Sequence, residues 1–234
     1  MEEIRQILAG LDWSPLFISI KTGIAATIVS FFLGIWAARK VLKAKTGLRA
    51  VLDGILTLPL VLPPTVAGFF LLLIFSTRRT VGSYLYTTFD IKIVQSWAGC
   101  VIAATVIAFP LMYRNARAAF EQVDVNLIYA GQTLGMSDRK IFWKVIVPAA
   151  GPGIASGTVL AFARAIGEYG ATSMLAGNIL GKTRTVSVAI ASETAAGNYD
   201  VAGFWVVVIV VISFVIVVLI NIVSGRGMKS RRWI

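Results

Sequence analysis

Long apolar runs separated by short, mostly basic intervals dominate the hydrophobic pattern of this 234-residue chain. A helix needs about 20 predominantly apolar residues to cross the hydrocarbon core of a bilayer. Runs of that length predict about five transmembrane helices, near residues 16–38, 48–76, 93–113, 145–166 and 201–223. We therefore expect an all-α integral membrane protein, in which residues 1–234 form a single membrane domain.

Prolines interrupt the second apolar run at Pro59, Pro63 and Pro64. The part that follows, residues 65–76, is too short to cross the bilayer alone, so the run predicts one broken span. Proline is tolerated at membrane depth where neighbouring helices or water satisfy the freed carbonyl groups. This side of the span is expected to face the protein interior, and Pro63 and Pro64 become candidates for a translocation pathway or gate.

Residues 171–192 are long enough for a sixth span, but Lys182 and Arg184 lie at their centre. Each charge there costs about 2.5–3.5 kcal/mol on the insertion scale. We interpret the segment as a partly re-entrant or extracellular element. Irregular backbone at membrane depth occurs where it lines a cavity or is buried in protein, so Tyr169 and Asn178 are candidate gate residues.

The charge of the chain indicates a membrane rather than nucleic acid. Charged residues make up 14% of the sequence, against about 25% in a soluble domain, and the mean hydropathy is +0.82. The net charge of +11 is spread between the apolar runs instead of forming one basic face. Counting Lys and Arg in the loops favours five spans with the N-terminus outside and the C-terminus in the cytoplasm. The expected location is the plasma or inner membrane, as a multi-pass protein.

Arg164 and Glu168 are the charged residues that we expect deep in apolar sequence. Because they are four residues apart, they share a helix face and can pair. One interpretation is a neutralising pair that locks the fourth span to its neighbours. The other is functional, since charge inside a membrane often marks a pathway: Arg164 attracts an anion, and Glu168 holds it or shapes the gate.

The longest polar interval that could form ordered structure is residues 129–148. The sequence predicts a short helix over 126–134, ended by Gly135, because glycine adopts the left-handed conformation without steric cost. Ser137 or Asp138 is expected to cap a second helix that runs to Pro148. A short helix held between two spans has a shape suited to docking into another protein.

The spacing of this interval resembles the EAA signature of ABC-importer permeases, roughly E-A-A, three residues, G, nine residues and I-x-L-P. Ala130, Gly131 and Gly135 match its spacing, followed after nine residues by the run VIVP. Tyr129 stands where the family usually has Glu, and Gly131 where it usually has Ala. The resemblance implies a type I ABC importer permease fold over 14–224, with a coupling loop at 124–144 that docks into a cytoplasmic ATPase. The implied coupling residues are Asn126, Tyr129, Ala130, Gly131, Leu134, Gly135 and Pro148.

Two further stretches, 58–75 and 160–190, are similar to permeases for the oxyanions molybdate, tungstate and sulfate, and most similar to molybdate permeases. The resemblance implies a subunit that translocates molybdate or tungstate by alternating access. It also implies a homodimer of this chain, two cytoplasmic ATPase subunits and an extracytoplasmic oxyanion-binding protein. A sulfate or thiosulfate permease is the alternative.

The sequence predicts that this chain is not an enzyme. It has no histidine, a common general base and metal ligand, and no phosphate-binding GxxxxGK[ST] motif. We expect no metal site and no cofactor on this chain, with ATP and Mg²⁺ used by the partner ATPase. An ion-gradient-driven transporter or a channel subunit is the alternative from another class, and the coupling-loop spacing weighs against both.

Overall fold

The computed structural model describes residues 12–228, and its side chains as far as residue 218. Every regular element within the described residues is helical. In chain order the elements are α2 (Ser14–Leu42), α3 (Thr46–Val61), α4 (Pro64–Phe75), α5 (Thr80–Phe89), α6 (Trp97–Glu121), α7 (Val125–Thr133), α8 (Asp138–Ile141), the π-helix η1 (Phe142–Ile146), α9 (Val147–Ala149), α10 (Gly151–Ile166), α11 (Gly170–Leu175), α12 (Val186–Ala195) and α13 (Tyr199–Met228).

Three of the described helices, α2, α6 and α13, are individually long and apolar enough to cross a membrane. Two further pairs qualify only as bent spans. The α3–α4 pair bends by 108° and the pair 138–149 with α10 bends by 73°. Counting each pair as one span gives up to five spans, which confirms the predicted all-helical membrane fold.

The core is a close-packed group of α2, α6 and α10. Alanines fill much of it, and Ala26, Ala108 and Ala161 are fully buried. A Cβ on Gly34 would lie 2.7 Å from Met112 Cγ, so this glycine sets how closely α2 approaches α6. Small residues at such contacts let membrane helices pack through their backbones.

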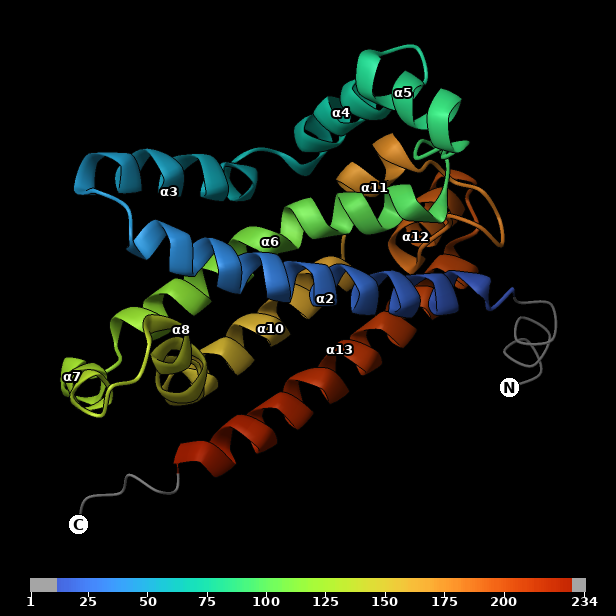
Figure 1. Cartoon of the computed structure of the whole chain (residues 1–234). Coiled ribbons are helices and arrows are strands. Elements are labelled where there is room, and N and C mark those ends of the chain that lie inside the picture. Colours follow the sequence, from blue (N-terminus) through green and yellow to red (C-terminus); the bar gives the residue numbers. More distant parts are fainter. Residues whose placement is uncertain (1–11, 229–234) are drawn as a thin grey trace.

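The two ends of the bundle differ in content (Figure 1). At one end, α7 and α8 lie with the C-terminal ends of α2 and α6. We call this the basic end, because residues 39–49 and 114–144 carry ten Lys and Arg residues. At the other end, the distal end, lie α5, α11 and α12.

The second span breaks where the prolines predict. Helix α3 ends at Val61, Leu62 and Pro63 are extended, and α4 restarts at Pro64. Proline suits the first position of a helix, where its missing N–H has no intrahelical acceptor. Pro59 lies inside α3 and does not end it. The break therefore comes from the Pro63–Pro64 pair.

Residues 171–192 form no single helix in the described structure. The short helices α11 and α12 are joined by an irregular segment in which Gly177 and Gly181 have positive φ angles of 71° and 67°. This arrangement agrees with the interpretation as an irregular element rather than a sixth span.

Candidate functional site

Side-chain and backbone caps fix both ends of α7. Asp124 Oδ1 accepts a hydrogen bond of 2.8 Å from the N–H of Asn126 at the start of the helix. At the other end Gly135 has φ +69°, its N–H donates to Gln132 O, and the N–H of Met136 donates to Gly131 O. Both bonds satisfy carbonyl groups that the helix end would otherwise leave free. The predicted short helix and its left-handed glycine are confirmed.

The segment after α7 is less regular than the sequence predicts. Ser137 caps α8 by accepting from the N–H of Lys140, as expected. The helix then changes to the π-helix η1, and Val147 N–H donates to Phe142 O, five residues back. Pro148 lacks the N–H that would continue an α-helical ladder. The expected helix that runs to Pro148 is therefore present, but its five residues before Val147 form a π-helical turn that the sequence did not predict.

Most of helix α7 is exposed, including apolar side chains in the helix and at its C-cap, Leu134. Leu127, Tyr129 and Leu134 are exposed by 47%, 57% and 79%. Gly131 is buried, and a Cβ there would lie 3.1 Å from Ile141 Cγ1. Asn126, Ala130 and Gly135 are also exposed, while Pro148 lies outside α7, at the bend before α10. Exposed apolar side chains often mark interaction sites, and of the implied coupling residues only Gly131 is buried.

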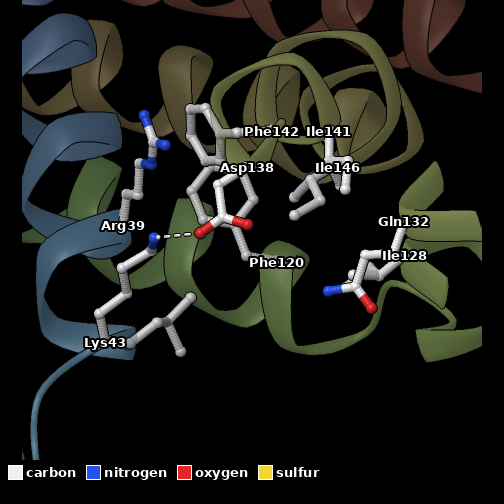
Figure 2. Close-up of a pocket in the computed structure, with 10 residues that line it drawn as sticks. Arg39, Lys43, Phe120, Ile128, Gln132, Asp138, Ile141, Phe142 and Ile146 are labelled. Carbon is white, nitrogen blue, oxygen red and sulfur yellow. Dashed lines mark hydrogen bonds and ion pairs between the residues drawn. The ribbon is translucent and has the colours of Figure 1, made fainter. Parts of the chain in front are cut away.

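A pocket of about 320 Å³ separates α7 and α8 from the end of α2 (Figure 2). Lys43 Nζ lies 3.3 Å from Asp138 Oδ2 across it, and the Arg39 guanidinium lies 4.1 Å from the centre of the Phe142 ring. Both partners of the ion pair are well exposed, and such pairs contribute about 0–1 kcal/mol. The buried side chains of Ile141 and Phe142 therefore do most to hold the loop on the bundle.

Arg164 and Glu168 pair as the sequence predicts, with Arg164 Nη1 2.6 Å from Glu168 Oε2. The Glu168 side chain is 1% exposed and that of Arg164 is 31% exposed. The other Glu168 oxygen accepts a 2.8 Å hydrogen bond from the N–H of Ala171, in the first turn of α11. A buried charge persists where it is paired and hydrogen-bonded. Glu168 thus joins the end of α10 to the start of α11.

The first turns of α4 and α11 meet at the proline break. A Cβ on Gly170 would lie 3.0 Å from Pro64 Cβ, and one on Gly68 would lie 2.7 Å from Ala171 Cα. The structure therefore gathers most of the predicted gate residues in one region: Pro63, Pro64, Arg164, Glu168 and Tyr169. It gives Asn178 a different setting, where its side-chain amide donates to Ser192 Oγ of α12 at 3.0 Å.

A second cluster of charges joins α3 to α6 and was not predicted from the sequence. Asp53 forms an ion pair with Arg117 and accepts a hydrogen bond from the Tyr113 hydroxyl. Arg49 forms an ion pair with Glu121. Asp53 is thus a further paired charge within an apolar run, 48–76, beside the predicted pair of Arg164 and Glu168. The Arg–Asp and Arg–Glu spacings of four residues on two helices were the available signal.

A further ion pair lies at the distal end. Arg184 Nη2 lies 2.7 Å from Glu193 Oε1, and the Asn198 amide donates to Glu193 Oε2 at 2.8 Å. The Asn198 hydrogen bond and the Arg184 partner lower the pKa of Glu193 against the opposing effect of burial. Among the described residues, no three His, Cys, Asp or Glu side chains come close enough to hold a metal ion.

Comparison with known proteins gives one consistent result. The family model described as "Binding-protein-dependent transport system inner membrane component" matches residues 30–225. The putative molybdenum transport system permease protein YvgM of Bacillus subtilis is 39% identical, over 92% of this chain and 95% of that one. The molybdenum transport system permease protein ModB of Escherichia coli K12 is 43% identical over 79% and 80%. The sulfate transport system permease protein CysT of Salmonella typhimurium is 32% identical over 88% and 75%.

Solved structures with the same fold are ABC importers. The chain aligns with an inward-facing MetNI methionine ABC transporter with a TM-score of 0.67, at 15% identity and over 98% of both chains. A bacterial ABC transporter that imports the acidic polysaccharide alginate gives a TM-score of 0.73, at 16% identity over 97% of this chain and 83% of that one. At these identities the likeness concerns the fold, which is that of type I ABC importer permeases.

Proposed function

The chain belongs to the binding-protein-dependent transport system inner membrane components, and on this premise we propose that it is the permease subunit of an ATP-driven importer of molybdate or tungstate. As a member of that family it is a non-catalytic membrane component. The observation that carries the proposed substrate is the 39% identity to a molybdenum permease over nearly the whole of both chains. The sulfate permease CysT is less similar, at 32% identity.

The proposed partners follow from the two ends of the bundle. A cytoplasmic ATPase docks on the exposed side chains of α7 and its C-cap, among them Tyr129 and Leu134. An external binding protein delivers the oxyanion to the distal end. We propose that two copies of this chain and two ATPase subunits form the complex, and that the ATPase binds the ATP and Mg²⁺. This places the basic end in the cytoplasm, as the distribution of Lys and Arg favours.

The proposed pathway passes the junction of α4, α10 and α11. An anion that crosses a membrane needs polar or positive groups along its route. Arg164 supports such a role, because its guanidinium is 31% exposed while its partner Glu168 is buried. Alternating access then requires the junction to open toward one side at a time as the coupling helices are drawn together.

ATPase activity of the purified complex in liposomes, together with its binding protein, tests this proposal. Molybdate, tungstate and sulfate are added in turn. Stimulation by molybdate or tungstate at low concentration, with sulfate inert, is the expected result. Stimulation by sulfate would move the substrate to the alternative supported by the relative CysT. If no ATPase co-purifies, the proposed importer is wrong, and a channel or secondary transporter becomes the better account.

A further inference from the structure

The Asp53 cluster is the main polar attachment of α3 to the bundle. No residue of α3 is buried, and the helix packs chiefly along α6. Leu52 and Leu56 rest partly buried against the core. Beside them lie the two cross-helix ion pairs, Arg49 with Glu121 and Asp53 with Arg117. The side chains of Asp53 and Arg117 are each only 23% exposed, so water screens this pair less than a surface pair.

The four charges form two ion pairs between α3 and α6, Arg49 with Glu121 and Asp53 with Arg117, which we call the ladder. These pairs fit only one alignment of the two helices. Arg49 and Asp53 lie one turn apart on α3, and Arg117 and Glu121 lie one turn apart on α6 in the complementary order. Arg117 Nε also lies 3.2 Å from Glu121 Oε1. If α3 slid by one turn, Arg49 would face Arg117 or Asp53 would face Glu121. Like charges would then oppose each other, so the ladder holds α3 against sliding along α6.

The ladder lies between the two regions that transport must connect. Glu121 is the last residue of α6, and Asp124, three residues later, caps α7. From Asp53, helix α3 continues to the break at Pro63 and Pro64. Beyond the break, α4 touches the start of α11 through Gly68. A displacement of α7 therefore acts first on the turn of α6 that carries the ladder.

We propose that Asp53 and Arg117 are positioning residues that make α3 and the end of α6 move as one rigid strut, which transmits the displacement of α7 to the proline break. This proposal rests on the proposed importer function and adds the route by which ATP hydrolysis reaches the gate. Neither residue contacts the transported anion. Their role is to keep hydrolysis and transport in proportion.

The ratio of anion transported to ATP hydrolysed, measured in liposomes with molybdate, tests the strut. The variants are Asp53→Asn, Arg117→Gln and the double variant. Coupling between sites corresponds to factors of roughly 5–150, so each single variant is expected to lower the ratio at least about fivefold while ATP hydrolysis continues. The double variant is expected to be no worse than the poorer single one, since the two residues act as a pair.

A matched control is Arg184→Gln, which breaks the ion pair with Glu193 at the distal end. It is expected to leave the ratio unchanged. A purely structural role for Asp53 would lower transport and hydrolysis together, in step with the amount of assembled complex. A parallel fall in transport and hydrolysis, or an unchanged ratio in both single variants, would contradict the proposed strut.

A covalent link provides a test if the neutral variants fail to assemble. The variant carries both Arg49→Cys and Glu121→Cys, and a bifunctional methanethiosulfonate reagent joins the two cysteines. The covalent link replaces the ion pair of Arg49 with Glu121 and leaves the pair of Asp53 with Arg117 intact. Cys100, the one native cysteine, is buried. A rigid strut predicts equal transport before and after linking. Loss of transport on linking, restored by reduction, means that α3 and α6 must move apart, which contradicts the strut.

The unsubstituted complex separates the two proposals. If it shows no anion-stimulated hydrolysis and no uptake, the proposed function fails. If it transports molybdate and the variants keep its ratio, the function stands and the strut fails.

Discussion

Glu168 holds two helices together through its two oxygens, and one of them lies 2.6 Å from the Arg164 guanidinium. The other accepts the hydrogen bond from the N–H of Ala171, in the first turn of α11. The two interpretations of this pair, a lock between helices and a feature of an anion pathway, are compatible in this geometry. Glu168 is buried and structural, whereas Arg164 keeps about a third of its side chain accessible. We therefore propose Arg164 as the member of the pair that faces the pathway.

Removing the charge of Arg164 is expected to reduce transport. A charged lining raises local substrate concentration and association rates by roughly 10–10³-fold, so Arg164→Leu should lower molybdate uptake at least about tenfold. Arg164→Lys keeps the charge and should retain most of the uptake. Uptake into liposomes, normalised to assembled complex, is the measurement. Normal uptake by Arg164→Leu would leave the pair with a locking role alone.

A methyl group at Gly68 is expected to disturb the gate. Its Cβ would lie 2.7 Å from Ala171 Cα, a backbone atom, so α4 and α11 must separate. Overpacking of this kind costs about 1–3 kcal/mol. Gly68→Ala should therefore lower the thermal midpoint of the complex and its uptake. Gly203→Ala, in α13 with open space around the new Cβ, serves as the control and should change neither.

The end of α7 depends on the positive φ of Gly135. A left-handed conformation costs a residue with a Cβ about 1–2 kcal/mol, so Gly135→Ala should loosen the last turn of α7 and weaken binding of the ATPase. Asparagine tolerates this conformation better, and Gly135→Asn should behave almost like the unsubstituted chain. Hydrogen exchange across residues 125–136 reports the fraying. Equal protection in all three proteins would contradict this account.

Tyr129 is expected to be an anchor for the ATPase. Truncating a central aromatic contact costs about 2 kcal/mol or more, and each 1.4 kcal/mol is a factor of about ten in affinity. Tyr129→Ala should therefore weaken ATPase binding at least about tenfold. The control is Tyr84→Ala at the distal end, because Tyr84 is 60% exposed, close to the 57% of Tyr129. The measurement is the affinity of the ATPase for each variant, obtained by titration in detergent. Equal affinities for Tyr129→Ala and Tyr84→Ala would show that Tyr129 has no anchoring role.

The ion pair of Glu193 predicts a pH dependence at the distal end. Its pKa is lowered from 4.5, first by the hydrogen bond from Asn198 and also by Arg184. A carboxyl group with a lowered pKa stabilises the fold above its unfolded pKa and loses that contribution as the pH falls through its folded pKa. The thermal midpoint of the native complex should thus exceed that of Glu193→Gln near pH 6. The difference should shrink below pH 4.5, and a constant difference would contradict the assignment.

The sequence by itself determined the features that depend on nearby residues. Apolar length fixes where helices can span, and the pair Pro63–Pro64 ends one of them. The caps Asp124 and Ser137 and the left-handed Gly135 are equally local, since each satisfies backbone groups within a few residues. For the same reason, the spacing of four was enough to predict that Arg164 meets Glu168.

Only the tertiary structure decided which faces meet. Asp53 finds Arg117 from a distant helix, Gly68 lies against Ala171, and Asn178 turns to Ser192 rather than to the gate. Each of these contacts depends on how far a helix is rotated and shifted along its neighbour. Packing of the whole bundle sets this rotation and shift. The hydrophobic pattern within one segment does not determine either of them. The π-helix before Pro148 was likewise not apparent, because proline removes a hydrogen bond without specifying how the preceding turn adapts.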